Sequence, residues 1–319
     1  MGLSFYEKKK KSKKLWTLLL VLVIAALGAA CWMFKVKQEE RELAARKKQE
    51  ERTVRITIPE GYTAELAAKK FEQKDICKAE DFLKAAGDLD GYSYEWLESV
   101  PKKAQVNYKL QGFLFPDTYE VYKHTDAKKI VAMMLNNFNT KWEQISKENK
   151  TGLTPYEIVT LASVVEREAK VDAEYAKISG VIYNRLDKKM KLQIDATVLY
   201  PLTKGKYNKK RTLYKDLEVD SPYNTYKNQG LPAGPICNPG INALKAAVSP
   251  QKHSYLYYHT DKTGKGTHIF SETFSQHEES LKNQAKYTKD TVIFWTRFFL
   301  EKKIHKVLKK IRRNLVKIL

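Results

Sequence analysis

A run of twenty residues without a charged side chain lies near the start of this sequence, from Leu15 to Phe34. At the rise of an α-helix this length matches the hydrocarbon core of a bilayer, so the run predicts a transmembrane helix. Trp16 and Trp32 lie near its two ends, as is typical of side chains at a membrane interface. Six lysines crowd residues 1–14, which favours a cytoplasmic N-terminus and a folded part on the outer side of the membrane.

Two other interpretations of this segment stay open. A basic start followed by an apolar run also describes a cleaved signal peptide, although the run is longer than a typical signal. Cys31 would be the lipidated residue of a lipoprotein, but Gly28 stands three positions earlier, where a large aliphatic residue is expected. The length of the run favours the transmembrane helix.

The charge of the chain is uneven along its length. More than half of the formal net charge of +21 comes from residues 1–14 and 297–319. Charged ends of this kind suit anionic lipid headgroups, and the sequence contains no nucleic-acid recognition motif. We therefore predict a membrane contact and no nucleic-acid partner.

The rest of the chain reads as two folded parts. Residues 35–52 are strong helix formers of mixed charge, which predicts a stalk. An alternating strand at Thr53–Ile58 precedes helices at Ala64–Phe71 and Asp81–Ala86, which together make a small α+β unit. Further helices are expected at Asp126–Trp142 and Tyr175–Leu186.

The predicted fold class is α+β, with a basic tail at 1–14, a transmembrane helix at 15–34, a stalk at 35–52, a small module at 53–107, a larger mixed α+β domain at 108–287 and a basic amphipathic tail at 288–319. That last tail suits a helix on a membrane surface, an ordinary docking helix or an extension that does not fold.

The best-specified helix runs from Thr154 to Ala169. Thr154 suits the N-cap, Pro155 the first helical position, and Glu157 lies three residues after the cap, which completes a capping box. An apolar stripe follows at helical spacing, and Glu166 and Glu168 lie on its two borders. A border position can be desolvated enough for an acid to hold a proton near neutral pH. The helical wheel does not choose between these two glutamates, and two solvated side chains fit it as well.

Polar side chains with binding chemistry follow in the second half. We expect a strand at Met190–Leu199, with Gln193, Asp195 and Thr197 on one face; a solvated edge strand would show the same pattern. Asn238 and Pro239 are expected to cap the helix that ends near Val248. Strands at Tyr255–His259 and Thr267–Phe270 predict a hairpin that carries His268.

Several chemistries lack their sequence signals. The histidines have no close helical pairing, so we predict no metal site. The segment around Gly264 lacks the glycine spacing and Lys-Ser/Thr ending of a phosphate loop. The sequence also has no nucleophile elbow and no reactive-cysteine signature.

Taken in order, several blocks resemble one family. The blocks read LQGFLFPDTYEV, ASVVEREA, VIYNRL with MKLQIDATVLY, SPYNTY with GLPAGPICNPG, and HIFSETFSQH. They are similar to the successive motifs of the MltG, or YceG-like, endolytic murein transglycosylases, over roughly residues 53–287. The resemblance implies a single-pass membrane protein with a small LysM-like module and a catalytic α+β domain outside the membrane. It implies cleavage of nascent peptidoglycan strands to 1,6-anhydromuramyl ends, without a cofactor, with cell-wall synthesis enzymes such as penicillin-binding proteins as candidate partners.

The resemblance also assigns site residues. The first glutamate of the family's E-[KR]-E block is its catalytic acid, and it falls on Glu166. Gln193 and Asp195 match the LQ-x-D block, and His268 matches the histidine before the last strand. Asn224 and Tyr226 match YNTY. These five residues are expected in the substrate cleft.

The chemistry separates the candidate functions. A lytic transglycosylase cleaves the MurNAc–GlcNAc bond with the sugar's own C6 hydroxyl as nucleophile, so one glutamate can serve as acid and then as base. A hydrolytic muramidase would need a second carboxylate, for which Asp195 or Glu168 is the candidate. A wall-binding protein without catalysis would use the small module and the aromatic segment Tyr108–Val121.

Overall fold

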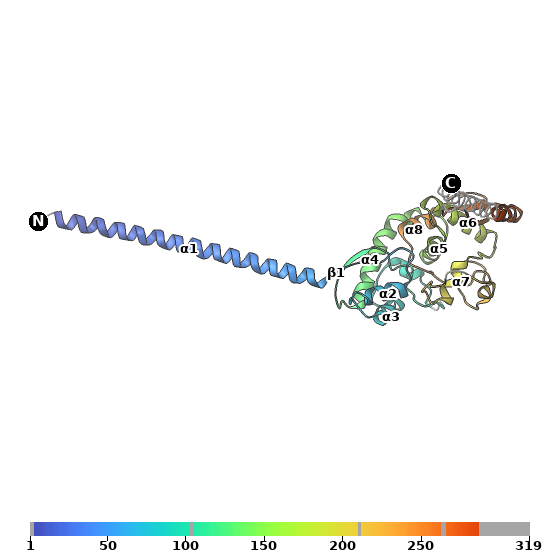
Figure 1. Cartoon of the computed structure of the whole chain (residues 1–319), viewed down its shortest axis with the longest axis horizontal. Helices are drawn as coiled ribbons and strands as arrows, with labels where there is room; N and C mark the ends of the chain where they lie inside the picture. The colour runs from blue at the N-terminus through green and yellow to red at the C-terminus, as the bar shows by residue number, and fades with distance from the viewer. Residues whose placement is uncertain (1–2, 103–104, 210–211, 263–265, 287–319) are drawn as a thin grey trace, which may run out of the picture. The chain divides into compact units, whose positions relative to one another are not determined.

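The computed structural model describes residues 3–102, 105–209, 212–262 and 266–286. One long helix, α1 (Leu3–Arg52), contains both the apolar run and the charged stalk (Figure 1). Within it, Trp16–Ala44 is long and apolar enough to cross a membrane, a property that anchors share with signal sequences. Trp16 and Trp32 are both exposed. The basic tail predicted at 288–319 lies outside the described residues.

The chain divides into two compact units. The first holds α1, the start of strand β1 (Thr53–Thr57) and residues 120–123, which include the end of strand β2 (Thr118–Tyr122). The second holds residues 56–119 together with the described residues from His124 onward. β1 and β2 pair in a two-stranded sheet. The sheet therefore joins a strand of the predicted small module to one that follows residue 107.

Two short helices follow β1 as the sequence predicts. Helix α2 (Ala64–Glu72) begins after Thr63, whose hydroxyl accepts a hydrogen bond from the amide of Leu66. Helix α3 (Ala79–Gly87) begins two residues earlier than expected and includes Gly87. Phe71 and Phe82 join the two helices, with ring centroids 5.1 Å apart.

The aromatic segment after residue 107 belongs to the core. Phe113 is fully buried, and its ring stacks on Trp96 at a centroid distance of 4.4 Å. Phe138, on α4 (Ala127–Ile145), packs edge-on against both rings. Asp126 caps α4 by accepting hydrogen bonds from two of its first amides. These three aromatic side chains are core residues, whereas Tyr108, at the start of the segment, is half-buried and lines a pocket of about 1060 Å³.

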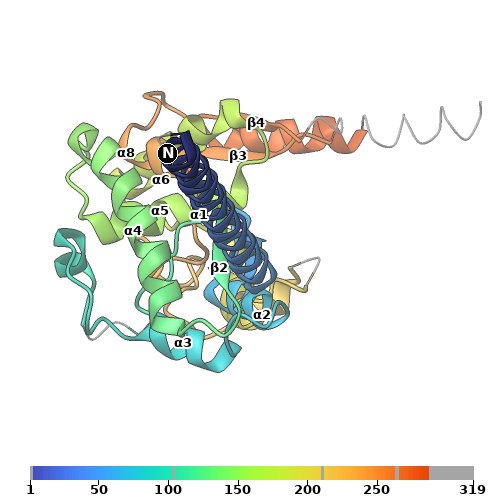
Figure 2. The ribbon, with the colours of Figure 1, turned by 90° about the vertical axis from the view of Figure 1, so that its left-hand side faces the viewer.

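Three helices form the centre of the second unit. Helix α5 (Pro155–Glu168) contacts both α6 (Tyr175–Asp187) and α8 (Ile241–Val248), as Figure 2 shows. The predicted capping box of α5 is confirmed: the amide of Thr154 donates to Glu157 Oε2 at 2.8 Å, and the amide of Glu157 donates to Thr154 Oγ1 at 3.3 Å. Further elements are the 3-10 turns Glu95–Ser99, Ser146–Glu148, Asp172–Glu174 and Tyr214–Glu218, helix α7 (Asp195–Leu202), and strands β3 (Tyr257–Thr260) and β4 (His268–Ser271). The described part of the chain ends in a helix at residues 274–286.

The predicted hairpin is confirmed, whereas the predicted strand at Met190–Leu199 is wrong. β3 and β4 pair antiparallel with His268 opposite Thr260. Met190–Leu199 is not a strand, because α7 begins at Asp195 and the Thr197 hydroxyl turns inward to donate to the carbonyl of Ile194 at 2.6 Å.

Asn238 does not cap the helix that follows it. Gly240 holds the N-cap position of α8. The side chain of Asn238 is fully buried and instead binds two distant backbone groups, accepting from the amide of Gly112 at 2.7 Å and donating to the carbonyl of Tyr62 at 2.9 Å. These tertiary hydrogen bonds replace the local cap.

Candidate active site

Glu166 lies half-buried in the last turn of α5. Its Oε2 atom accepts a hydrogen bond from the amide of Gly240 at 3.1 Å, and the Tyr175 hydroxyl lies 3.5 Å from its Oε1 atom. Burial raises the pKa of Glu166 from 4.5 to about 7, and the negative charge of Glu60 acts in the same direction. The hydrogen bonds from Gly240 and Tyr175 and the charge of Arg167 offset part of this rise. The carboxyl group can therefore both hold and release a proton near neutral pH.

A polar pocket of about 340 Å³ lies beside the end of α5. Gln193, Asp195 and His268, three of the residues predicted for the cleft, all line it, and so does Glu168. Because Glu166 and Glu168 are two positions apart on one helix, their side chains leave α5 in nearly opposite directions. The pocket wall accordingly carries Glu168, whereas Glu166 faces Gly240 and Tyr175.

Tyr226 joins this group through Asp195. Its hydroxyl donates to Asp195 Oδ1 at 2.6 Å. Burial and the nearby carboxylate hold the pKa of Tyr226 well above its usual range, so the phenol stays a donor.

Asn224 is placed differently from the other predicted cleft residues. It is fully buried, and its side-chain amide donates to the carbonyls of Leu217 and Val219, each at 2.8 Å. Its Oδ1 atom accepts from the amide of Tyr226 at 2.9 Å. The side chain thus shapes the loop that carries Tyr226 and has no exposed surface for a ligand.

Two residues that the sequence did not single out organise the pocket. Glu174 is 7% exposed; its Oε2 atom lies 2.7 Å from His268 Nδ1, and its Oε1 atom accepts from the His268 amide at 2.9 Å. Tyr258, on the opposite strand, donates to Glu168 Oε2 at 3.0 Å. Burial, with the charge of Asp195, raises the pKa of Glu168, while Tyr258 and His268 offset this. Neither Glu174 nor Tyr258 belongs to a local pattern, because each meets its partner only through tertiary packing.

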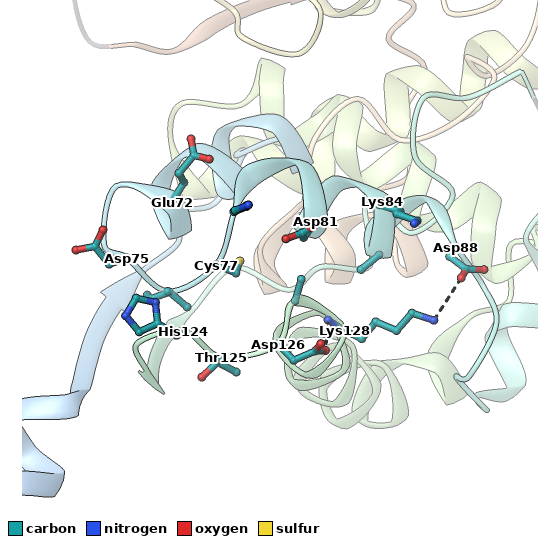
Figure 3. A pocket seen from close by; sticks show the side chains of 14 residues that line it. Glu72, Asp75, Cys77, Asp81, Lys84, Asp88, His124, Thr125, Asp126 and Lys128 are labelled. Atoms are coloured by element: carbon teal, nitrogen blue, oxygen red, sulfur yellow. Dashed lines mark hydrogen bonds and ion pairs between the residues drawn. The ribbon is translucent and has the colours of Figure 1, made fainter.

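A second, acidic cavity of about 810 Å³ lies between α2, α3 and the start of α4 (Figure 3). Figure 3 shows Cys77 and His124 among its carboxylates, with Lys128 bound to Asp88 at 3.5 Å. Burial and the surrounding carboxylates raise the pKa of Cys77 to about 11, so its thiol stays protonated. Within the ranges that the structure describes, no cluster of His, Cys, Asp or Glu side chains could hold a metal ion.

Two half-buried acids with raised pKa values, Glu166 and Glu168, therefore lie at the end of α5, and Glu168 lines the polar pocket. The chain belongs to the YceG-like family, whose sequence model matches residues 6–283. This match confirms the resemblance that the motifs indicate.

Relatives with known names support this membership. An endolytic murein transglycosylase of Bacillus subtilis (strain 168) is 42% identical over 233 residues, which cover 70% of this chain and 63% of the relative. A protein of the same name from Streptococcus pneumoniae serotype 2 (strain D39 / NCTC 7466) is 33% identical over 246 residues, which cover 71% of this chain and 44% of the relative. The chain thus spans less than two thirds of the length of these relatives. The crystal structure of a YceG-like protein from Listeria monocytogenes matches 70% of this chain and 75% of its own, with a TM-score of 0.60 and 38% identity.

Proposed function

We propose that this protein is an endolytic lytic transglycosylase that cleaves the MurNAc–GlcNAc bond of peptidoglycan strands. The observation that carries the proposal is the environment of Glu166, whose burial raises its pKa to about 7. The names of the relatives from Bacillus and Streptococcus support the same activity. Cleavage of this bond needs an acid to protonate the leaving oxygen, and Glu166 is suited to that role.

The reaction uses the same carboxyl group twice. Protonated Glu166 donates its proton to the glycosidic oxygen as the bond from C1 to that oxygen breaks. The C6 hydroxyl oxygen of the muramyl sugar then forms a new bond to C1, and its proton returns to Glu166. No water is consumed, and the product carries a 1,6-anhydro ring. A pKa near the working pH serves both proton transfers.

The polar pocket supplies candidate contacts for the sugars. The amide of Gln193, the carboxylate of Asp195 and the ring of His268 line it together, and Tyr226 is bound to Asp195. These groups offer donors and acceptors for hydroxyl and acetamide groups. Asn224 contributes by holding the loop of Tyr226 in place.

Hydrolysis is the second candidate reaction. Glu168 is a second acid with a raised pKa, and Asp195 lies on the same pocket wall. Either could serve a muramidase as its second carboxylate. The two reactions give products of different mass, because a hydrolase adds water, about 18 Da, to the cleaved end.

The proposed architecture follows the sequence. Residues 15–34 anchor the chain in the cell membrane as a single pass, with residues 1–14 in the cytoplasm. The stalk at 35–52, the LysM-like module at 53–107 and the catalytic domain at 108–287 then lie outside the cytoplasm. Nascent glycan strands are the substrate, and enzymes of cell-wall synthesis such as penicillin-binding proteins are the proposed partners.

Digestion of purified glycan strands tests the proposal. The unaltered chain is expected to release anhydro ends that mass spectrometry identifies, and Glu166→Gln is expected to lose at least about 100-fold in rate because it removes the general acid. Glu148→Gln, which makes the same change at an exposed site on the turn Ser146–Glu148, serves as the control and should be unaffected. Full activity of Glu166→Gln, or reducing ends from the unaltered chain, contradicts the proposal.

A further inference from the structure

The loop between β1 and α2 is bound to the segment before α8. The amide of Gly61 donates to the carbonyl of Asn238 at 3.0 Å, and the amide of Asn238 donates to the carbonyl of Tyr62 at 2.8 Å. The buried side-chain amide of Asn238 also donates to the Tyr62 carbonyl, at 2.9 Å, which makes three hydrogen bonds between the loop and this segment. This loop, more than 100 residues away from Glu166 in the sequence, is therefore held in a defined place beside α5 and α8.

Glu60 lies against Gly240 because of this loop. A Cβ atom at position 240 would lie 1.9 Å from Glu60 Oε1 and 2.1 Å from its Cδ, so the carboxylate fills the space that a side chain would need. Gly240 is also the residue whose amide binds Glu166 Oε2 at 3.1 Å. With standard backbone dimensions, these two contacts place the two carboxylates at most about 7.5 Å apart.

We propose that Glu60 is a positioning residue for Glu166: its negative charge, held at Gly240 by the loop, adds to the effect of burial and favours the protonated form of Glu166 before the acid step. The inference deepens the proposed function and rests on Glu166 as its acid. The small module at 53–107 then completes the active site, because the charge comes from that module and acts on a helix of the catalytic domain. A small module that only bound the glycan would have no need of this contact.

Within the described residues, Arg167, Tyr175 and Cys237 also interact with Glu166. Arg167 lies on the same helix, and its guanidinium stacks over the ring of Tyr207 at 3.9 Å from the centroid. Tyr175 comes from α6 and donates to Glu166. The buried thiol of Cys237, whose pKa burial raises well above its usual range, stays neutral. Arg167 is a cation, and the Tyr175 hydroxyl and the Cys237 thiol are neutral. The negative charge that opposes ionisation of Glu166 therefore comes from Glu60.

The test measures the titration of Glu166 without relying on activity. The full chain, labelled with ¹³C at the glutamate carboxyl carbons and held in detergent at low ionic strength, is titrated by NMR, and the signal absent from Glu166→Gln identifies Glu166. Its midpoint in the unaltered chain is expected near the pKa of about 7. For an exposed charge at most 7.5 Å away, Glu60→Gln should lower the midpoint by at least about 0.4 pH unit.

Three further variants make the test specific. Glu60→Asp keeps the charge and should return the midpoint toward that of the unaltered chain. Gly240→Ala should lower the midpoint as Glu60→Gln does, because the new Cβ displaces the Glu60 carboxylate while the backbone φ of −78° accepts alanine. Asp172→Asn removes an exposed charge that acts on Tyr175, and it should leave Glu166 unchanged.

The outcomes separate this inference from the proposed function. An unchanged midpoint in both Glu60→Gln and Gly240→Ala overturns the role of Glu60, and so does an equal fall in Asp172→Asn. If the midpoint shifts as expected but the unaltered chain releases no anhydro ends, the proposed function fails and the coupling of the two carboxylates stands.

Discussion

Replacing Glu166 by glutamine should stabilise this protein at high pH and leave its stability unchanged at low pH. The pKa of Glu166 is raised on folding, so the folded chain binds that proton more tightly than the unfolded chain does. The stability that the protonated group provides is complete below the unfolded value of 4.5, and it is lost as the pH rises through about 7. Glutamine resembles the protonated acid in shape and has no charge to bury.

The structure sets the size of this effect. A rise of the pKa from 4.5 to about 7 corresponds to about 3 kcal/mol of unfolding free energy at pH 8.5. Glu166 is half-buried, so solvent screening makes this value an upper bound. For a folded part of this size, the thermal midpoint of Glu166→Gln should exceed that of the unaltered chain by several degrees, up to about 12 °C, at pH 8.5.

Thermal unfolding of the full chain in detergent, followed by near-ultraviolet circular dichroism at pH 4 and pH 8.5, measures the difference. Trp96 is 2% exposed and reports on the packed core. Glu148→Gln, at an exposed position, should show no pH-dependent gain. Equal midpoints for Glu166→Gln and the unaltered chain at pH 8.5 would refute the burial argument, and so would an equal gain at both pH values.

Two further predictions concern the packing around the site. Gly112 has a φ of +92°, and a Cβ atom there would lie 2.6 Å from Pro235 and Val159. Gly112→Ala should therefore lower the unfolding free energy, measured by urea titration, by about 2–4 kcal/mol. A loss under about 0.5 kcal/mol would contradict the steric argument. Glu174→Ala removes the carboxylate whose Oε2 atom lies 2.7 Å from His268 Nδ1. If the His268 ring binds substrate, the KM for glycan strands should rise more than kcat falls in steady-state assays. An unchanged KM argues against a binding role for the His268 ring.

Local sequence patterns predicted the elements whose signals lie within a few residues of one another. The capping box of Thr154 and Glu157, the alternation at Thr53–Ile58 and the hairpin around His268 are all present in the structure. Each depends on hydrogen bonds or side-chain periodicity inside one element, and such signals need no knowledge of the rest of the fold.

Local sequence patterns gave wrong predictions where a polar side chain forms hydrogen bonds with residues that are distant in the sequence. Asn238 has the residue type of a helix cap, but its amide binds the backbone of Tyr62 and Gly112 instead. Thr197 fits the polar face of a strand, yet its hydroxyl is buried and shares a hydrogen bond of 2.8 Å with that of Thr225. A buried polar group must be paired, and the sequence does not show which pairing the fold provides.

The sequence by itself determined the helix that is compatible with a membrane, the extent of α5 and the positions of Glu166 and Glu168 at the borders of its apolar stripe. The length of an apolar run and helical periodicity are properties of contiguous residues. Only the tertiary structure decided that Glu166 meets Gly240, Tyr175 and the charge of Glu60, while Glu168 meets Tyr258 across the pocket. The environment of an acid is set by segments brought together from distant parts of the chain, and a pKa depends on that environment rather than on the residue type alone.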